Sequence, residues 1–271
     1  MRGASGAATG ALGDRVTRLL DALRGGIVVS CQATDDSPLK EPVFMAAMAR
    51  AGELAGAVGI RANGPADVAA IRAAVTLPII GIDKRPDIDP VAYITPNLAS
   101  VSALVAAGAD LVAIDATLRP RGGRSAASSA ASSAAPSAAP SAAPSAAVLI
   151  AQIREAHPDL PVMADVARLD EGLAAAEAGA DIVATTLSGY TADSAAMEGP
   201  DLELIAALVA AQDRPVIAEG RFSTTEHVRA AFAAGAHAVV IGTSITDPLA
   251  LARKFVAAAP RRGRTLGRRG N

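Results

Sequence analysis

The sequence contains no tryptophan, and its aromatic residues are two tyrosines and four phenylalanines in a chain of 271 residues. Proteins that bind single-stranded nucleic acids stack the bases on exposed aromatic rings, which this composition can hardly supply. The formal net charge of −2 gives no general attraction to nucleic acids or to anionic membranes. We therefore expect neither nucleic acid nor membrane among the partners.

Cysteine, histidine and long apolar runs are also scarce. Cys31 is the only cysteine, so no disulfide can form within the chain, which suits a reducing cytoplasm. No apolar run approaches the roughly 20 residues of a membrane span. His157, His227 and His237 all lie away from the C-terminal ends of the predicted strands, which argues against a histidine triad or a histidine metal site. Walker and G-x-G-x-x-G motifs are absent, so we expect neither a metal nor a cofactor.

Three segments lack the composition of a packed core. Residues 1–13 are expected to form a disordered extension, and residues 260–271 a disordered basic tail, which contains five arginines. Residues 125–147 repeat serine, alanine and proline, which is typical of a flexible segment. Residues 14–259 are expected to form one domain that contains the segment 125–147 as a flexible insertion.

Two kinds of segment alternate along this domain and give eight predicted strands. One kind starts with proline or glycine, as in GGIVVSCQ, LPIIGIDK, LPVMADV and RPVIAEG, and the other with Gly-Ala, as in GAVGIRAN, GADLVAIDAT, GADIVATTLS and GAHAVVIGTS. Alanine- and leucine-rich helical segments lie between them, and Gly108, Gly179 and Gly235 are placed to end three helices. Eight such units predict an α/β fold, the TIM (β/α)8 barrel, with residues 125–147 inserted in the loop after the fourth strand. An open doubly wound sheet is the alternative.

The alternation of side chains along a strand predicts which polar residues face the inside of the barrel. Val28, Ile80, Met163 and Ile217 share the inward parity, whereas Cys31 has the opposite parity and is expected to be a packing residue. The polar side chains expected at the C-terminal mouth of the barrel are Gln32, Arg61, Lys84, Asp115, Asp165, Thr186 and Glu219. Any single carboxylate in this set has salt-bridging as an alternative role, but convergence of the whole set favours an active site.

A lysine among carboxylates is suited to proton transfer at carbon, because burial lowers the pKa of an amine while neighbouring carboxylates oppose that shift. Schiff-base chemistry is equally open to such a lysine. Gly220 and Gly242 end the last two strands and are followed by hydroxyl residues, which is typical of a phosphate site. The residues alone therefore indicate an enzyme that acts on a small phosphorylated substrate.

The segments IVVSCQA, GAVGIRANG, PIIGIDK, AIDAT, MADV, TTLSGYT and PVIAEGR resemble, in order, bacterial N-acetylmannosamine-6-phosphate 2-epimerase. This resemblance implies a cofactor-independent TIM barrel that interconverts N-acetylmannosamine 6-phosphate and N-acetylglucosamine 6-phosphate in sialic acid catabolism, and a homodimer is plausible. It implies that Lys84 exchanges the C2 proton, with Glu219 as its catalytic partner and Asp165 orienting the lysine. Gln32 and Arg61 would bind substrate, and we expect Asp115 and Thr186, which share the inward parity, to bind it with them.

One position departs from the pattern of that family. Asp247 stands where the family usually has an arginine that contributes to phosphate binding, so Arg221 or Arg119 would have to compensate for its charge. We expect the phosphate at Gly220, Arg221, Gly242 and Thr243. Two alternatives stay open, namely a sensor that binds sugar phosphates without activity and a lyase that forms a Schiff base on Lys84.

Overall fold

The computed structural model describes residues 15–89, 91–119 and 144–259. Eight parallel strands close into a barrel in which each strand pairs with the next along the chain and the last pairs with the first. The strands are β1 (Ile27–Cys31), β2 (Gly59–Asn63), β3 (Ile79–Ile82), β4 (Leu111–Asp115), β5 (Val162–Asp165), β6 (Ile182–Ala184), β7 (Val216–Glu219) and β8 (Ala238–Ile241). This closure confirms the predicted TIM barrel over the open sheet.

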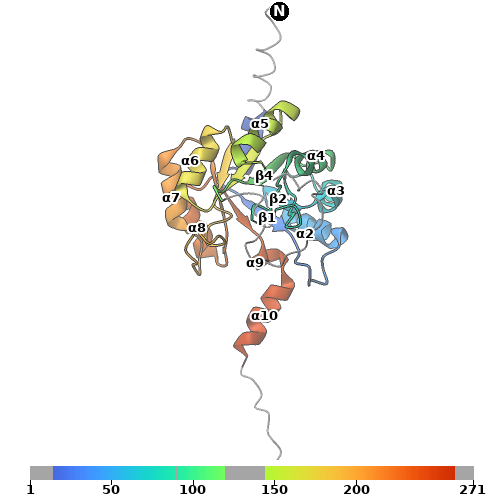
Figure 1. Ribbon diagram of the computed structural model, residues 1–271. Coiled ribbons are helices and arrows are strands. Elements are labelled where there is room, and N and C mark those ends of the chain that lie inside the picture. Colours follow the sequence, from blue (N-terminus) through green and yellow to red (C-terminus); the bar gives the residue numbers. More distant parts are fainter. Residues whose placement is uncertain (1–14, 90, 120–143, 260–271) are drawn as a thin grey trace, which may run out of the picture.

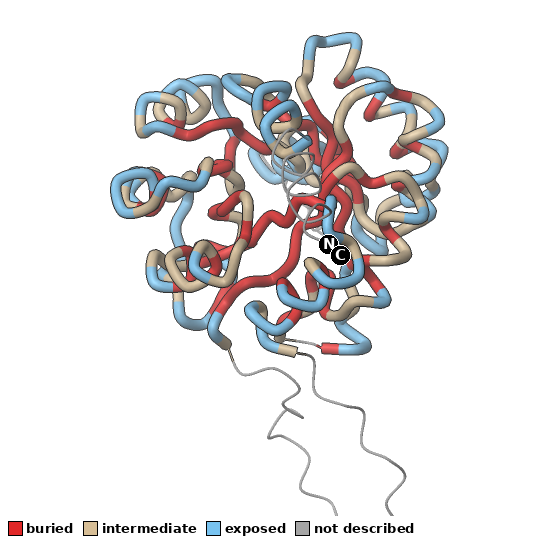
Figure 2. The backbone as a smooth tube through the Cα atoms, turned by 90° about the horizontal axis from the view of Figure 1, so that it is seen from above, coloured by how far each residue is buried: buried red, intermediate tan, exposed pale blue. Residues whose placement is uncertain are grey.

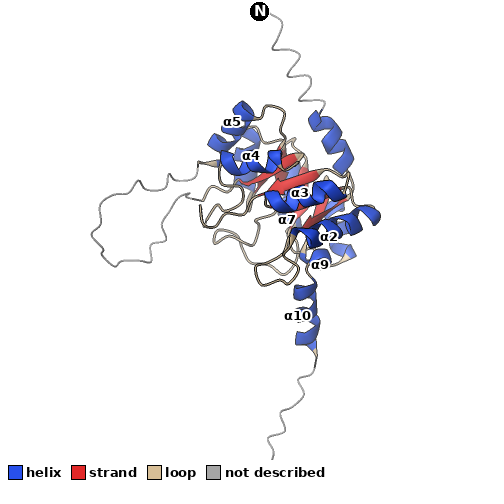
Figure 3. Ribbon diagram, turned by 90° about the vertical axis from the view of Figure 1, so that its right-hand side faces the viewer, coloured by secondary structure: helices blue, strands red, loops and turns tan. Residues whose placement is uncertain are grey.

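Helices surround the barrel on its outer side (Figures 1 and 3). They are α2 (Pro42–Leu54), α3 (Pro65–Ala74), α4 (Leu98–Ala106), α5 (Ala146–Ala156), α6 (Leu169–Glu177), α7 (Leu202–Ala211) and α8 (Thr225–Ala233). The short helix α9 (Thr243–Thr246) follows β8, and α10 (Pro248–Ala258) extends away from the barrel. Gly108, Gly179 and Gly235 each follow a helix with positive φ angles of 102°, 97° and 95°, as predicted for helix C-terminal glycines.

Two apolar layers share the strands between them. Val28, Ile80, Met163 and Ile217 belong to the cluster inside the barrel, as strand parity predicts. Cys31 lies in the second cluster, between the strands and the helices. Burial, and then the negative charge of Asp67, raises the pKa of its thiol to about 12, which confirms a packing role. Viewed from above, the strands form the buried centre of the molecule (Figure 2).

The first described segment closes the N-terminal end of the barrel. Residues 15–23 are helical, and Leu23 is fully buried within the inner cluster. A ring nitrogen of His237 lies 2.7 Å from the carbonyl oxygen of Leu20 and ties this helix to β8. His237 is thereby engaged at the end of the barrel away from the predicted site.

The predicted C-terminal boundary of the serine/alanine/proline segment, residues 125–147, overlaps the start of α5. Ser145 caps α5 by accepting a hydrogen bond from the Val148 N–H, and the helix begins at Ala146. The rest of this segment up to residue 143 lies outside the described residues, as do the predicted extension 1–13 and tail 260–271. Within the described residues, no helix combines the length and the apolar character needed to cross a membrane.

Candidate active site

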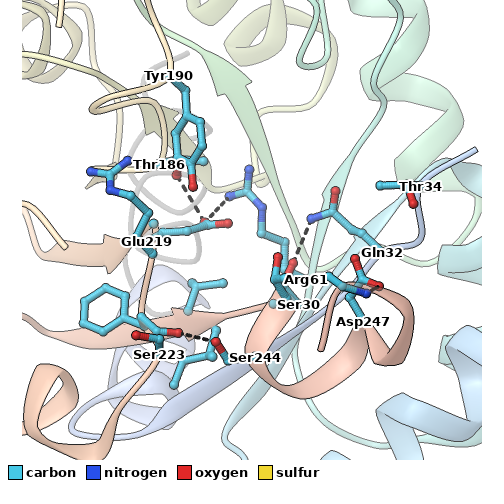
Figure 4. A pocket seen from close by; sticks show the side chains of 18 of the residues that line it. Ser30, Gln32, Thr34, Arg61, Thr186, Tyr190, Glu219, Ser223, Ser244 and Asp247 are labelled. Carbon is cyan, nitrogen blue, oxygen red and sulfur yellow. Dashed lines mark hydrogen bonds and ion pairs between the residues drawn. The ribbon is translucent and has the colours of Figure 1, made fainter. Parts of the chain in front are cut away.

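A cavity of about 620 Å³ opens at the C-terminal mouth of the barrel (Figure 4). Nine of the eleven residues predicted for the site line it, as does Asp247; the nine are Gln32, Arg61, Lys84, Thr186, Glu219, Gly220, Arg221, Gly242 and Thr243. Asp165 lies beneath this lining, fully buried, and contacts the cavity residues from below. The positions predicted from strand parity therefore lie together at the mouth of the barrel, with the exception of Asp115.

The floor of the cavity is an ion-pair network centred on Arg61. Its Nη2 donates to Asp165 Oδ2 at 2.6 Å and its Nη1 to Asp165 Oδ1 at 3.2 Å. Nη1 also lies 3.1 Å from Glu219 Oε2. Burial lowers the pKa of Arg61, but the two carboxylates outweigh this effect and the net pKa is raised. Arg61 is 1% exposed, so the cost of burying its charge is offset by the two acidic side chains that surround it.

Thr186, which follows β6, joins the same two carboxyl groups from the other side. Its hydroxyl oxygen lies 2.7 Å from Asp165 Oδ1 and 3.1 Å from Glu219 Oε2. Thr186 was predicted to bind substrate, and it does line the cavity. Its hydroxyl group is nevertheless engaged with protein groups.

The backbone of Lys84 is fixed from two sides at the tip of β3. Its N–H donates to Asn63 Oδ1 at 2.9 Å, and the residue forms an antiparallel bridge with Ile94. Its neighbour Asp83 points the other way and accepts a hydrogen bond of 2.6 Å from Ser100 on α4, as parity predicts. The clamp on both sides of the backbone directs the lysine side chain into the cavity.

The electrostatics of the site move the pKa values of Lys84 and Glu219 in opposite directions. Desolvation within the cavity mouth, and then the charge of Arg61, lowers the pKa of Lys84, although Glu219 and Asp165 oppose this effect. Burial raises the pKa of Glu219, and Asp165 adds to the rise while Arg61, Thr186 and Lys84 oppose it. Within the described residues Lys84 forms no ion pair, so its ammonium group is accessible from the cavity. A base and an acid thus line one cavity, and the pKa of each is shifted toward neutral pH.

Two buried polar atoms of the described residues have no hydrogen-bond partner, and both belong to this site. They are Gln32 Oε1 and Arg61 Nε. Gln32 is oriented by its amide nitrogen, which donates to Ser30 Oγ at 2.7 Å. A buried polar group without a partner is costly. The pair therefore offers one acceptor and one donor to a ligand in the cavity.

Asp115 is placed differently from the rest of the predicted set. It is fully buried, and its carboxylate accepts hydrogen bonds from the Thr117 hydroxyl at 2.6 Å and from Arg119 Nη2 at 2.8 Å. Among the described residues, neither Asp115 nor Arg119 lines the cavity. The geometry therefore gives Asp115 contacts that organise the β4 loop, and it engages the cation that was considered for phosphate binding.

The β7 loop forms the opposite end of the cavity. Arg221 has a positive φ of 58° and follows Gly220, whose φ is 112°. Its guanidinium donates to the carbonyl oxygens of Gly199 at 2.7 Å and Ser188 at 2.6 Å, and stacks 5.0 Å from the Tyr190 ring centroid. A Cβ at Gly189 would come within 2.7 Å of this guanidinium, so glycine makes room for it. Arg221 thus fastens the loop after β6 over the cavity.

The β8 end carries one helix cap and one cation that strand patterns could not reveal. Asp247 caps α10 by accepting a hydrogen bond of 2.9 Å from the Ala250 N–H, so its carboxylate has a structural partner. Lys254, two turns further along α10, also lines the cavity. Because Lys254 lies on a helix outside the barrel, the parity of strand residues carries no information about it.

The long loop after β3 contributes aromatic and apolar lining. Tyr93 and Ile94 face the cavity, and the carbonyl oxygen of Tyr93 accepts a hydrogen bond of 2.8 Å from the Arg85 N–H. The loop therefore covers one side of the site. Across the described residues, no group of three or more histidine, cysteine, aspartate or glutamate side chains could hold a metal ion.

Comparisons with known proteins point to one family. The family model described as putative N-acetylmannosamine-6-phosphate epimerase matches residues 45–134 and 138–261. The chain is 41% identical over 238 residues to a putative N-acetylmannosamine-6-phosphate 2-epimerase of Caldanaerobacter subterraneus, covering 88% of this chain and 92% of the relative. It is 44% identical over 241 residues to the protein of the same name from Cutibacterium acnes, covering 88% and 95%.

A solved structure agrees with these matches. The N-acetylmannosamine-6-phosphate 2-epimerase from Clostridium perfringens superimposes with a TM-score of 0.77 at 35% identity, covering 89% of this chain and 96% of that chain. A thiamine phosphate pyrophosphorylase from Pyrococcus furiosus, with a TM-score of 0.52 at 20% identity, shares the fold alone.

Proposed function

The chain belongs to the N-acetylmannosamine-6-phosphate epimerase family, and from this we propose that it interconverts N-acetylmannosamine 6-phosphate and N-acetylglucosamine 6-phosphate in amino sugar and sialic acid catabolism. The two sugars differ in configuration at C2, so a proton must leave one face of that carbon and another must arrive on the opposite face. One observation carries the proposal: Lys84, with a lowered pKa, and Glu219, with a raised pKa, line the same cavity.

The C2 proton becomes acidic when C1 is an open-chain aldehyde, because the electron pair of the broken C–H bond then moves toward O1. The resulting enolate oxygen needs a cationic or hydrogen-bonding donor. Arg61 meets this need, since it is held buried with its Nε unpaired. Gln32 Oε1 accepts a hydrogen bond from the substrate, and its orientation is set by Ser30.

The proton steps follow from the two shifted groups. The neutral amine of Lys84 takes the C2 proton, and the carboxylic acid of Glu219 delivers its own proton to the other face of C2. The roles reverse for the opposite direction. The lowered pKa of Lys84 increases its neutral fraction, and the raised pKa of Glu219 maintains its acid form. Asp165 keeps Arg61 in place beside Glu219 through two hydrogen bonds.

The phosphate binds at the β7 and β8 end of the cavity in this proposal, at Gly220, Arg221, Gly242 and Thr243. The N–H groups of Thr243 and Ser244 begin the short helix α9, ahead of Ile245 and Thr246, whose N–H groups donate to the Gly242 carbonyl oxygen. Arg221 contributes charge although its hydrogen bonds go to carbonyl groups. Lys254 provides the cation that offsets Asp247, whose carboxylate is engaged in capping α10.

We further propose a cytoplasmic homodimer. Cys31 is buried and unpaired, which suits a reducing compartment. Helix α10 extends away from the barrel in two perpendicular views (Figures 1 and 3), and none of its residues is buried. Phe255 and Val256 are 72% and 73% exposed there, so a second copy covering α10 would remove apolar surface from water. Light scattering of the wild type and of Phe255→Glu tests this point, and a monomeric wild type would refute it.

A coupled assay with both hexosamine 6-phosphates and both unphosphorylated sugars tests the function. The proposal expects interconversion of the phosphorylated pair and much slower conversion of the free sugars. Binding of a sugar phosphate without any turnover would instead identify a sensor. Borohydride in the same mixture leaves an epimerase unlabelled, whereas a covalent adduct that depends on Lys84 would identify Schiff-base chemistry.

A further inference from the structure

The hydroxyl group of Thr186 lies between two carboxyl groups and has only one proton to give. Its oxygen is 2.7 Å from Asp165 Oδ1 and 3.1 Å from Glu219 Oε2, and Figure 4 shows the side chain above Glu219. A hydroxyl group donates one hydrogen bond and accepts up to two. When Thr186 donates to Asp165, its contact with Glu219 needs a proton that comes from Glu219.

The surrounding charges decide which carboxyl group carries that proton. Both oxygens of Asp165 accept hydrogen bonds from Arg61, so Asp165 has only acceptor positions to offer. Glu219 receives a single contact from the same guanidinium, at 3.1 Å. The charged groups that face Glu219 are Arg61 from β2, Lys84 from the tip of β3 and Asp165 from β5. Of the two carboxyl groups, Glu219 is therefore the one that can present an O–H to Thr186.

We propose that Thr186 is a positioning residue that holds Glu219 Oε2 in both protonation states by turning its hydroxyl group. With Glu219 protonated, the Glu219 O–H donates to Thr186 and Thr186 donates to Asp165. During the reaction the Glu219 O–H turns from Thr186 toward C2 and its bond breaks, so that the proton and the electron pair on C2 form the new C–H bond while the electron pair of the O–H bond stays on Glu219. The Thr186 hydroxyl group then turns and donates to the new carboxylate. This role rests on the proposed epimerase function.

Loss of the hydroxyl group has a defined electrostatic consequence. Hydrogen bonds to a charged acceptor are stronger than those between neutral groups, so the ionised form of Glu219 loses more than the acid form. Burial already raises the pKa of Glu219, and the Thr186 hydrogen bond opposes that rise. Removing the hydroxyl group therefore raises the pKa of Glu219 further and leaves the ionised carboxylate less well oriented.

The test compares Thr186→Val, which keeps the shape of the side chain, with Thr186→Ser, which keeps the hydroxyl group. Carbon-13 NMR of glutamate-labelled protein follows the Glu219 carboxyl resonance with pH, and its absence in Glu219→Gln assigns it. We expect Thr186→Val to titrate at higher pH than the wild type and Thr186→Ser to titrate with the wild type. The pH limb of kcat that reports Glu219 should move in the same direction, with kcat about tenfold lower in Thr186→Val.

The proposal is overturned if Thr186→Val titrates as the wild type does, or if Thr186→Ser shifts as far as Thr186→Val. Thr186→Ala gives the same comparison with Thr186→Ser if the valine side chain prevents folding. The NMR titration needs no substrate. The wild type could lack epimerase activity while the Glu219 titration still changes in Thr186→Val. That result would refute the proposed function but would support the contact between the Thr186 hydroxyl group and Glu219.

Discussion

The two ends of the cavity are built in different ways. At the floor, Arg61, Asp165, Thr186 and Glu219 are held by one another through short contacts between side chains. At the β7 and β8 end, the lining combines two glycines with hydroxyl, apolar and charged residues, and its cation Lys254 is exposed. The floor is held by contacts between side chains, whereas Arg221 and Asp247 at the other end bond to backbone carbonyl and N–H groups. We therefore expect the second end to tolerate an aspartate at position 247.

The largest effect is expected when Arg61, the cation of the floor, is removed. Arg61→Met leaves the Asp165 carboxylate buried without its counter-charge and removes the contact with Glu219, and we expect the free energy of unfolding to fall by about 3–5 kcal/mol together with loss of activity. Urea unfolding at neutral pH measures the change. Adding Asp165→Asn to Arg61→Met should recover part of the loss, because it removes one unpaired charge. A loss well below 1 kcal/mol in the single variant would show that the network does not hold the floor.

A smaller effect is expected for the pH dependence of stability. The folded pKa of Glu219 lies above its ordinary value of 4.5, so the folded protein binds more protons than the unfolded chain between those two pKa values. Stability attributable to Glu219 is therefore fully present below 4.5 and is lost as the pH rises through the folded pKa. Glu219→Gln removes this dependence, and the wild type should lose stability relative to the variant by about 1 kcal/mol toward neutral pH. Parallel stability curves would contradict the raised pKa.

The smallest expected effect is at the β8 end. Lys254→Ala should raise the KM for the sugar phosphate about fivefold and change kcat little, because an exposed cation contributes about 1 kcal/mol to binding an anion. Arg253→Ala is the matched control, since Arg253 lies next to Lys254 and pairs with Asp36 on the surface at 2.8 Å. An equal rise in KM for both variants would show that general surface charge, and not Lys254, attracts the phosphate.

The fold and the residues that form the floor of the cavity could be predicted from the sequence. Both depend on the pattern of strands and on the alternation of side chains along each strand. Parity placed Arg61, Glu219 and Thr186 on one face, and eight βα units fixed the barrel. The contacts within that face could not be predicted, since parity gives a direction but no partner. Asp115 shares the inward parity, yet its carboxylate is engaged by Arg119 from the loop that follows β4.

The roles of residues outside the strands could not be predicted from strand parity either. Lys254 reaches the cavity because α10 starts beside it, and the orientation of a helix after a strand depends on loop geometry that the sequence pattern does not contain. The charge of Asp247 suggested repulsion of phosphate, but its hydrogen bond to the Ala250 N–H gives that carboxylate a structural role. The contact of Asp247 with the start of α10 therefore has to be considered together with its charge.

Exchange of the C2 proton with solvent tests the central claim most directly, namely that Lys84 transfers that proton. In heavy water, the wild type should place a deuteron at C2 of N-acetylmannosamine 6-phosphate and its epimer, as followed by proton NMR. Lys84→Ala should fold normally and show no exchange, while Lys40→Ala, which alters an exposed lysine paired with Asp35, should exchange as the wild type does. Undiminished exchange in folded Lys84→Ala would contradict the account.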